Sequence, residues 1–221
     1  ESPRCAWRFV CHDWLVMSNI SKVTTDVLVV GAGPAGSSTA AWCARNGLDV
    51  LLIDAQTFPR DKACGDGLTP RAIKELNLLG LGNWLEGRAR NNGLCANGFG
   101  QTLHLPWPGG SLPNYGSAAP RLILDSVIRD VAIQSGAKTF EGVRAFDVEM
   151  LNGKITAVLC KSSQSEVRIE AKRIVIADGA KSQLGRVLDR KWHKDTVYGV
   201  AARGYIDSER SNDPWITSHL E

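Results

Sequence analysis

The chain has 221 residues, of which 43% are hydrophobic and 22% charged, so it is long enough to bury the core of one or two domains. Its formal net charge is only +3, and the sequence contains no dense basic patch, which argues against nucleic acid as a partner. No apolar run approaches the ~20 residues that a membrane-spanning helix requires.

The six cysteines are scattered along the chain. They form neither a CxxC pair nor the Cys/His spacing of a zinc site, so the sequence predicts no metal site. Single thiols at irregular spacing indicate a reducing environment, and we expect a cytoplasmic protein. The six are Cys5, Cys11, Cys43, Cys64, Cys95 and Cys160.

The first residues of the chain differ from the rest. Residues 1–16 show neither helix nor strand periodicity, and they lack the apolar segment and cleavage site of a signal peptide. Met17 is followed by a short polar stretch and then by a strong strand signal. We therefore expect residues 1–16 to be a disordered extension, with the folded domain beginning near Met17.

A strand, a glycine turn, a helix and a second strand open the folded part. Both apolar runs are typical of buried parallel strands, and the alanine-rich helix between them ends at Gly47. This βαβ unit predicts a parallel sheet with a right-handed crossover. The four segments are Asp26–Val30, Gly31–Gly36, Ser37–Asn46 and Asp49–Ile53.

The remaining elements alternate with long loops. The pattern predicts helices at Pro70–Leu79 and Arg121–Gln134, a loop over 58–69, and a Gly/Asn/Pro-rich region over 91–117 with a short strand at Thr102–Leu105. A return to the sheet and a β-rich stretch follow, with a hairpin around Asn152-Gly153. The expected strands are Lys138–Phe140, Val143–Leu151, Lys154–Lys161, Glu166–Ala171 and Arg173–Ala177.

The glycine turn carries a chemical signature. Gly31 permits a tight turn, Gly33 lets the backbone approach a pyrophosphate, and Gly36 allows the helix to pack closely on the strand. Phosphate groups bind at such a helix N-terminus because its free N–H groups and dipole favour negative charge. Asp54 ends the second strand, where an acidic side chain binds the ribose hydroxyls of a dinucleotide.

The type of dinucleotide follows from the residues around this motif. Ala40 and Gly47 extend it to GxGxxG-x3-A-x6-G, a longer pattern that is typical of FAD-binding flavoproteins. The acid at Asp54 disfavours a 2′-phosphate at this position, so an NADP-binding domain of the same type is not expected.

Two other segments are candidate sites. The loop Pro59–Gly67 surrounds Cys64 with turn-forming and basic residues, although composition alone favours a small buried residue at that cysteine. Asp178-Gly179 follows a buried strand, and in open α/β sheets the strand C-termini line the ligand crevice.

Together these motifs resemble the geranylgeranyl reductase family of flavoproteins, within the fold group typified by p-hydroxybenzoate hydroxylase. The resemblance runs from about Asp26 to Glu221 and is nearest to the branch that reduces menaquinone isoprenyl chains. It rests on GAGPAGS at Gly31–Ser37, FPRDKACGDGLTPRA at Phe58–Ala72, the Arg121-x3-Asp125 helix and ADGAKSQLGR at Ala177–Arg186.

The resemblance implies an α/β fold of the α+β flavoprotein type, with a Rossmann-like parallel sheet that binds FAD, a β-meander insertion and the start of an antiparallel substrate domain. The corresponding division is a non-family extension, an FAD-binding βαβ part, an excursion into the substrate domain, a return to the FAD-binding part with the meander, and the start of a truncated substrate domain. These cover residues 1–16, 17–90, 91–117, 118–185 and 186–221.

The resemblance also implies roles for individual residues. The pyrophosphate would be held by Gly31, Gly33, Pro34, Ala35 and Gly36. The ribose would bind Asp54, and the rest of the cofactor would lie near Arg60, Lys62, Gly65, Arg121, Asp178 and Gly179. At Cys64 the resemblance favours a catalytic position over a buried structural one.

The implied activity is reduction of C=C bonds in an isoprenyl chain by hydride from reduced flavin, with NAD(P)H or another reduced carrier as electron donor. An isoprenoid lipid substrate also implies peripheral contact with the inner face of the cell membrane. The family's later Gly-Asp segment and YxWxFP motif do not occur in these 221 residues, so we expect impaired activity from this length of chain alone. An FAD-dependent monooxygenase and a non-catalytic flavoprotein remnant are the alternatives.

Overall fold

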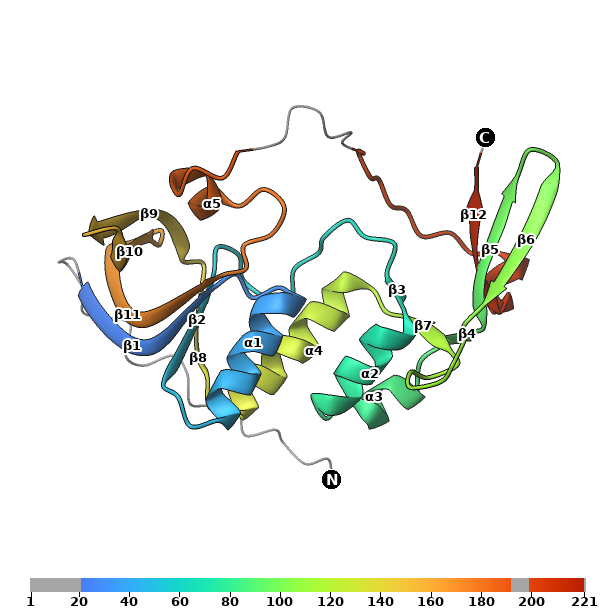
Figure 1. The fold of residues 1–221 in the computed structure, drawn as a ribbon, viewed down its shortest axis with the longest axis horizontal. Coiled ribbons are helices and arrows are strands. Elements are labelled where there is room, and N and C mark those ends of the chain that lie inside the picture. The colour runs from blue at the N-terminus through green and yellow to red at the C-terminus, as the bar shows by residue number, and fades with distance from the viewer. Residues whose placement is uncertain (1–20, 192–198, 221) are drawn as a thin grey trace, which may run out of the picture.

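The computed structural model describes residues 21–191 and 199–220, so the extension expected at 1–16 lies outside the described residues. A large sheet lies at one end of the molecule and two small sheets lie at the other, with helices between them (Figure 1). No helix within the described ranges has the length and hydropathy needed to span a bilayer.

The large sheet has six strands in the order β8-β2-β1-β11-β10-β9. The first four are parallel to one another, and β10 and β9 continue as an antiparallel meander. This mixed sheet confirms the expected α/β class. The strands are β1 (Ser21–Val30), β2 (Val50–Asp54), β8 (Lys138–Glu141), β9 (Arg144–Leu151), β10 (Lys154–Lys161) and β11 (Glu166–Ile176).

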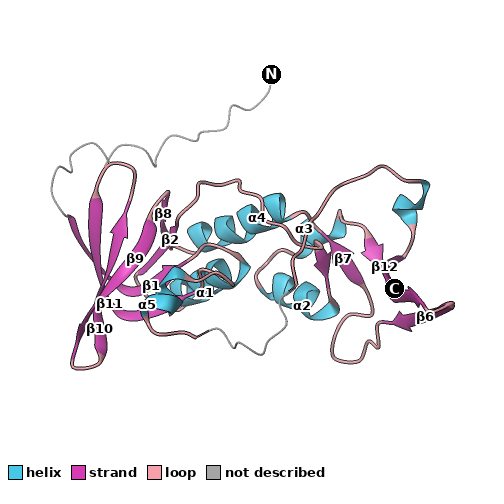
Figure 2. Ribbon diagram, turned by 90° about the horizontal axis from the view of Figure 1, so that it is seen from above, coloured by secondary structure: helices cyan, strands magenta, loops and turns pink. Residues whose placement is uncertain are grey.

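Both faces of the large sheet are covered. Val27 and Val29 of β1 join the apolar core beneath the helices, whereas Leu28 and Val30 join a second core on the meander side. Helices α1 (Pro34–Arg45) and α4 (Arg121–Gln134) lie side by side on the first face (Figure 2). The short helix α5 (Gln183–Val187) contacts β9, and its Leu184 belongs to the second core.

The first helix starts earlier than the sequence pattern predicts. It begins at Pro34 and not at Ser37, because proline fits the first helical position and Gly33 takes the extended conformation of an N-cap. Half of the glycine motif therefore forms the first turn of α1. This places the backbone N–H groups of Ala35 and Gly36 at the open end of the helix.

A second correction concerns β11. The sequence predicts separate strands at Glu166–Ala171 and Arg173–Ala177, but the structure forms one strand of 11 residues. Its early residues pair with β10 on one side and with β1 on the other. Ile169, for example, lies opposite Val158 of β10 and opposite Val23 of β1. Because β1 extends back to Ser21, it offers a partner along the whole length of β11.

The opposite end contains two three-stranded sheets. One pairs β7 (Gly116–Ala118) with β3 (Gly67–Leu68) and β4 (Arg90–Asn91), and the other has the order β12-β5-β6. In the latter, β5 (Gly93–Gly98) and β6 (Gln101–Pro106) are antiparallel, but β12 (Trp215–His219) runs parallel to β5. The remaining elements are α2 (Pro70–Leu78), α3 (Gly82–Glu86) and the 3-10 turn Glu209–Asn212.

Candidate functional site

The glycine turn between β1 and α1 requires glycine at two positions for reasons of packing. A Cβ on Gly31 would lie 2.4 Å from the Ala177 carbonyl oxygen, and one on Gly36 would lie 1.8 Å from the Gly31 carbonyl oxygen. Gly33 differs, because a Cβ there would meet only Arg60, at 3.6 Å from Nη2. Its backbone is therefore open to approach by a ligand.

Asp54 is bound to the same turn. Its Oδ2 accepts a hydrogen bond of 2.8 Å from the backbone N–H of Ala32, and its Oδ1 accepts one of 2.9 Å from that of Gln56. These bonds fix the carboxylate beside the glycine turn at the end of β2. A carboxylate that is oriented by backbone donors retains lone pairs for ribose hydroxyls.

A cavity of about 420 Å³ lies beside the first turn of α1. Ala35, Asp178, Gly179 and Arg190 line it. The first turn has neither a side-chain cap nor an acidic residue, so its N–H groups and dipole favour an anion. Asp178 Oδ2 accepts a hydrogen bond of 3.0 Å from the Gln183 N–H, while its buried Oδ1 has no partner among the described residues.

Arg60 extends from the loop after β2 across the glycine turn. Its Nη2 lies 3.6 Å from Asp54 Oδ2, and its guanidinium lies over the Phe58 ring at 4.9 Å. The side chain is 11% exposed, yet its buried Nε donates to no described group. An unpaired buried donor is costly unless a ligand satisfies it.

Asp125 joins the two arginines of the site. This residue of α4 is fully buried, and its carboxylate accepts hydrogen bonds of 2.6 and 2.8 Å from Nε and Nη2 of Arg121. Arg60 Nη1 lies 3.0 Å from Oδ2 of the same carboxylate. One buried anion thus orients two guanidinium groups, and paired charges of this kind are tolerated in an interior.

Cys64 lies next to this cluster. The hydrogen bond with Asp125 raises the pKa of the Arg121 guanidinium, and an interaction with Cys64 acts in the same direction. The sulfur is therefore adjacent to Arg121, and the thiol is free and half-buried. A Cβ on the neighbouring Gly65 would meet no atom within 4 Å, so the loop borders open space.

Lys62 connects the Cys64 loop with the Asp178-Gly179 turn. Its Nζ lies 3.2 Å from the position that a Cβ on Gly179 would occupy. Gly179 has φ +87°, a conformation that glycine adopts without strain. The structure thus brings together the glycine turn, the Cys64 loop, the start of α4 and the end of β11, all of which contain predicted site residues.

Asp66 and its partners were not among the residues predicted from the sequence. Asp66 accepts hydrogen bonds from the Arg121 backbone N–H at 3.3 Å, from Arg203 Nη1 at 3.2 Å and from the Tyr205 hydroxyl at 2.6 Å. The last bond raises the pKa of Tyr205. Arg203 also pairs with Asp61, and this hydrogen bond lowers the pKa of that carboxyl. A distant segment is thereby fastened to the Cys64 loop.

Different signals were available for the missed residues. Arg121 and Asp125 are four residues apart on a helix, the spacing of an ion pair, so Asp125 could have been identified as the partner of Arg121. The partners of Asp66 are 137 and 139 residues away, and no local pattern reveals them.

The geometry fits FAD as the cofactor. The open backbone at Gly33 and the uncapped first turn of α1 suit a pyrophosphate, and Asp54 suits a ribose. Arg60, whose Nε has no partner among the described residues, lies beside Gly33, and Asp178, whose Oδ1 likewise has none, lines the cavity at α1. Both atoms are buried and polar, and a bound dinucleotide offers them a partner.

Comparison with known proteins identifies the domain. A family model for the FAD binding domain matches residues 24–204. The menaquinone reductase of Mycolicibacterium smegmatis is 54% identical over 197 residues, which are 89% of this chain and 47% of the relative. Digeranylgeranylglycerophospholipid reductase 1 of Methanosphaera stadtmanae is 32% identical over 173 residues, which are 74% of this chain and 40% of the relative. The chain thus spans about half the length of these relatives or less.

Solved structures agree with this assignment. A geranylgeranyl bacteriochlorophyll reductase-like protein from Thermoplasma acidophilum has a TM-score of 0.67 and 27% identity, over 76% of this chain and 42% of that one. The myxobacterial chondrochloren halogenase, an FAD-dependent enzyme, has a TM-score of 0.69 and 21% identity, over 75% of this chain and 39% of that one. This likeness shows the shared fold. The chain therefore belongs to the FAD binding domain family, and its cofactor is FAD.

Proposed function

We propose that this chain is the FAD-binding part of an oxidoreductase that saturates C=C bonds in an isoprenyl chain attached to a quinone or a glycerolipid. The observation that carries the proposal is the Cys64 loop, which holds a half-buried thiol beside Arg121 at the edge of the dinucleotide site. The 54% identity to a menaquinone reductase and the 32% identity to a digeranylgeranylglycerophospholipid reductase support this substrate class.

Binding of FAD is assigned to the residues around the glycine turn. The backbone of Gly31, Gly33, Pro34, Ala35 and Gly36 receives the pyrophosphate at the N-terminus of α1. Asp54 binds the adenosine ribose, and Arg60 neutralises the adjacent phosphate charge. The arrangement leaves Arg121, Lys62, Gly65, Asp178 and Gly179 for the flavin end of the cofactor.

Bound FAD supplies a hydride equivalent that it has received from NAD(P)H or another reduced carrier. An unactivated alkene also needs a proton at its second carbon, so the protein must hold a proton donor near that carbon. We assign this role to Cys64, with Arg121 beside the sulfur to stabilise the thiolate that remains. Asp125 fixes the position of Arg121.

Anaerobic conversion of a menaquinone tests the proposed reaction. The purified chain is loaded with FAD, reduced with dithionite and incubated with menaquinone, and the product is examined by mass spectrometry. Each reduced C=C bond should add one pair of hydrogen atoms to the product. A chimaera that joins residues 21–220 to the remaining part of the M. smegmatis reductase supplies the length that the chain does not cover.

The chimaera makes the outcome decisive. If it binds FAD and leaves menaquinone unchanged while the intact M. smegmatis reductase converts it, the proposed function is wrong. Substrate-dependent oxygen uptake by the FAD-loaded chimaera would indicate a monooxygenase instead. Cys64→Ser in an active chimaera should lower kcat about 100-fold, because a hydroxyl is a far weaker acid than a thiol.

A further inference from the structure

Two acidic residues end neighbouring strands of the large sheet. Asp54 of β2 lies directly opposite Glu141 of β8 in the parallel register. Asp54 is bound to the glycine turn through the Ala32 N–H. Glu141 is bound elsewhere, since its Oε2 accepts a hydrogen bond of 2.8 Å from the Phe58 N–H and its Oε1 pairs with Arg129 Nη1. The two acids therefore have different tasks, and Glu141 has no part in the function proposed above.

Two guanidinium groups lie over the ring of Phe58. Arg129 Cζ is 4.8 Å from the ring centroid, and Arg60 Cζ is 4.9 Å from it. At these distances a guanidinium is attracted by an aromatic face. Two cations at one ring repel each other unless each has its own anion. Glu141 is that anion for Arg129, and Asp125 is that anion for Arg60, at 3.0 Å from Nη1.

These contacts are shielded from water. The side chains of Arg60, Arg129 and Glu141 are 11%, 16% and 24% exposed. Phe58 is half-buried and packs against the apolar core beneath the helices. Ion pairs at this depth are screened less than pairs on the surface. Their geometry therefore determines where the Arg60 guanidinium lies.

The Arg60 guanidinium is the end of this connection that faces the cofactor. Its Nη2 lies 3.6 Å from the position that a Cβ on Gly33 would occupy, next to the uncapped first turn of α1. Its Nε has no partner among the described residues. A free arginine side chain has many rotamers, so a ligand that must first order it binds more weakly than one that meets it already in place.

We propose that Glu141 is a positioning residue of the FAD site. Through Arg129 and Phe58 it holds the Arg60 guanidinium beside the glycine turn, so that the cofactor phosphates meet a charge that is already in place. This inference rests on the part of the proposed function that assigns Arg60 to the phosphates. Glu141 acts through Arg60 and not by contact with the cofactor, because its two oxygens are directed at Phe58 and Arg129.

A double-mutant cycle between Glu141 and Arg60 tests this role. FAD affinity is measured by flavin fluorescence in the chain and in the chimaera with the M. smegmatis reductase. Glu141→Gln puts an amide N–H where a carboxylate oxygen accepted a hydrogen bond, so we expect the Kd for FAD to rise about tenfold. In the Arg60→Gln background the same change should alter the Kd less than about twofold, because the side chain through which Glu141 acts is gone.

The ring of Phe58 provides a second test. Phe58→Leu keeps an apolar side chain but removes the aromatic face that both guanidinium groups contact, so the Kd for FAD should rise about tenfold. Phe58→Tyr keeps the ring and should bind FAD within about twofold of the unmodified chain. Equal FAD affinity of the leucine and tyrosine variants would overturn the inference.

The matched control is Glu149→Gln in the same sheet. Glu149 lies on the outermost strand β9, with two strands between it and β1, and pairs with Arg168 at 2.6 Å from Nη2. The control loses an ion pair of the same kind, and it should bind FAD like the unmodified chain. An equal loss of FAD affinity in Glu141→Gln and Glu149→Gln would overturn the inference.

The cycle separates positioning from a merely structural role. Tenfold losses for Glu141→Gln both with and without Arg60 would overturn the inference, because they indicate an effect on the fold that does not pass through Arg60. Unchanged FAD affinity in Glu141→Gln or in Arg60→Gln would overturn it as well. The proposed reaction is decided separately by menaquinone reduction in the unmodified chimaera, whereas the cycle measures FAD affinity and needs no turnover.

Discussion

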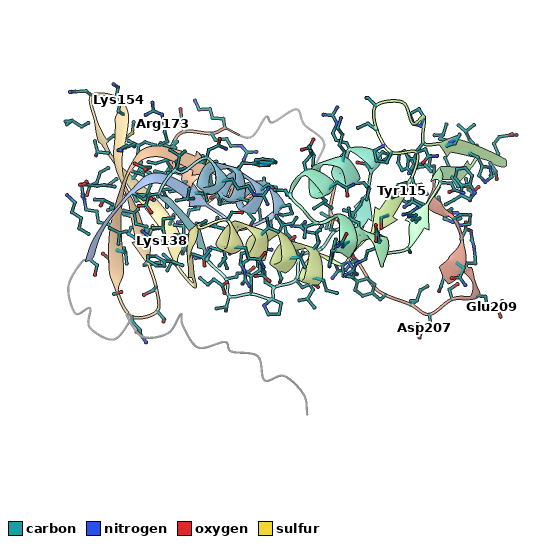
Figure 3. The ribbon with its side chains drawn as sticks, turned by 90° about the horizontal axis from the view of Figure 1, so that it is seen from below. Tyr115, Lys138, Lys154, Arg173, Asp207 and Glu209 are labelled. Carbon is teal, nitrogen blue, oxygen red and sulfur yellow. The ribbon has the colours of Figure 1, made fainter. Side chains whose placement is uncertain are left out.

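The two ends of the molecule bury their side chains to different degrees. In the large sheet, Val27–Val30 and Val50–Ile53 are at most 5% exposed, whereas every residue of β6 in the small sheet is exposed. Charged side chains such as Lys138, Lys154 and Arg173 lie around the large sheet, and Asp207 and Glu209 lie at the opposite end, outside residues 91–120, which contain no aspartate, glutamate, lysine or arginine (Figure 3). The large sheet is thus packed on both faces, whereas the β12-β5-β6 sheet leaves leucine side chains exposed.

The site lies where the two ends meet. The Cys64 loop follows β2 of the large sheet and leads into β3 of the β3-β7-β4 sheet, and the segment that contains Arg203 crosses above it toward β12 (Figure 1). The two ends are thus joined in part by the ion pairs of Arg203 with Asp61 and Asp66. Each contact can be removed separately.

The largest expected effect comes from Gly36→Ala in the large end. The new Cβ would lie 1.8 Å from the Gly31 backbone carbonyl oxygen, and both residues are buried. We expect the free energy of unfolding, measured with urea, to fall by more than about 3 kcal/mol. Gly87→Ala at the small end is the control and should change it by less than about 0.5 kcal/mol, since a Cβ there meets no atom within 4 Å. Similar losses in both would contradict the packing contrast.

Asp125→Asn should have the next largest effect. It leaves Arg60 and Arg121 without their shared anion, and breaking a buried pair costs about 3 kcal/mol of folding stability. FAD affinity, followed by flavin fluorescence, should fall about tenfold or more because the two guanidinium groups lose their positions. Asp130→Asn is the control on the same helix, since Asp130 is 49% exposed and pairs only with Arg129 among the described residues. Unchanged FAD affinity in Asp125→Asn would show that the cluster does not position the cofactor.

Arg203→Ala should loosen the junction without unfolding either end. It removes the partner of Asp61 and Asp66, so proteolysis within residues 59–67 should become several-fold faster. The hydrogen bond with Arg203 lowers the pKa of Asp61 in the folded protein. The stability that this ion pair contributes is therefore fully present above the ordinary pKa of 3.8, and it is lost as the pH falls through the lower pKa of the folded state. Arg210→Ala, whose ion pair with Asp213 lies outside the junction, should leave the cleavage rate unchanged.

The smallest effect is a difference in labelling rate between two buried thiols. Cys160 lies in the large sheet and is fully buried, which raises its pKa to about 12, whereas Cys95 lies in the small sheet at 7% exposure. At pH 8 we expect N-ethylmaleimide to modify Cys95 at least about tenfold faster, as measured by peptide mass spectrometry. In urea above the unfolding transition the two should react alike. Equal rates in the folded protein would mean that both ends open together.

Much of the fold could be predicted because its signals are local. The βαβ unit, the helices at Pro70 and Arg121 and the hairpin at Asn152-Gly153 are encoded by neighbouring residues. Asn152 and Gly153 both have positive φ, as the expected turn requires. The start of α1 and the continuous β11 were predicted wrongly, because a proline fits the first helical turn and because a long β1 offers a partner that the sequence of β11 does not reveal.

The nucleotide-binding motif is encoded locally, because glycine spacing and an acid at a strand end are read within one βαβ unit, and the family follows from further short motifs along the chain. The tertiary structure decided which charges meet. Asp125 forms ion pairs with both Arg60 and Arg121, and Asp66 accepts hydrogen bonds from Arg203 and Tyr205. The side chain of Ile216 lies next to Gly67. These contacts link residues far apart in the chain, so they exist only after the sheets have paired and the helices have packed against them.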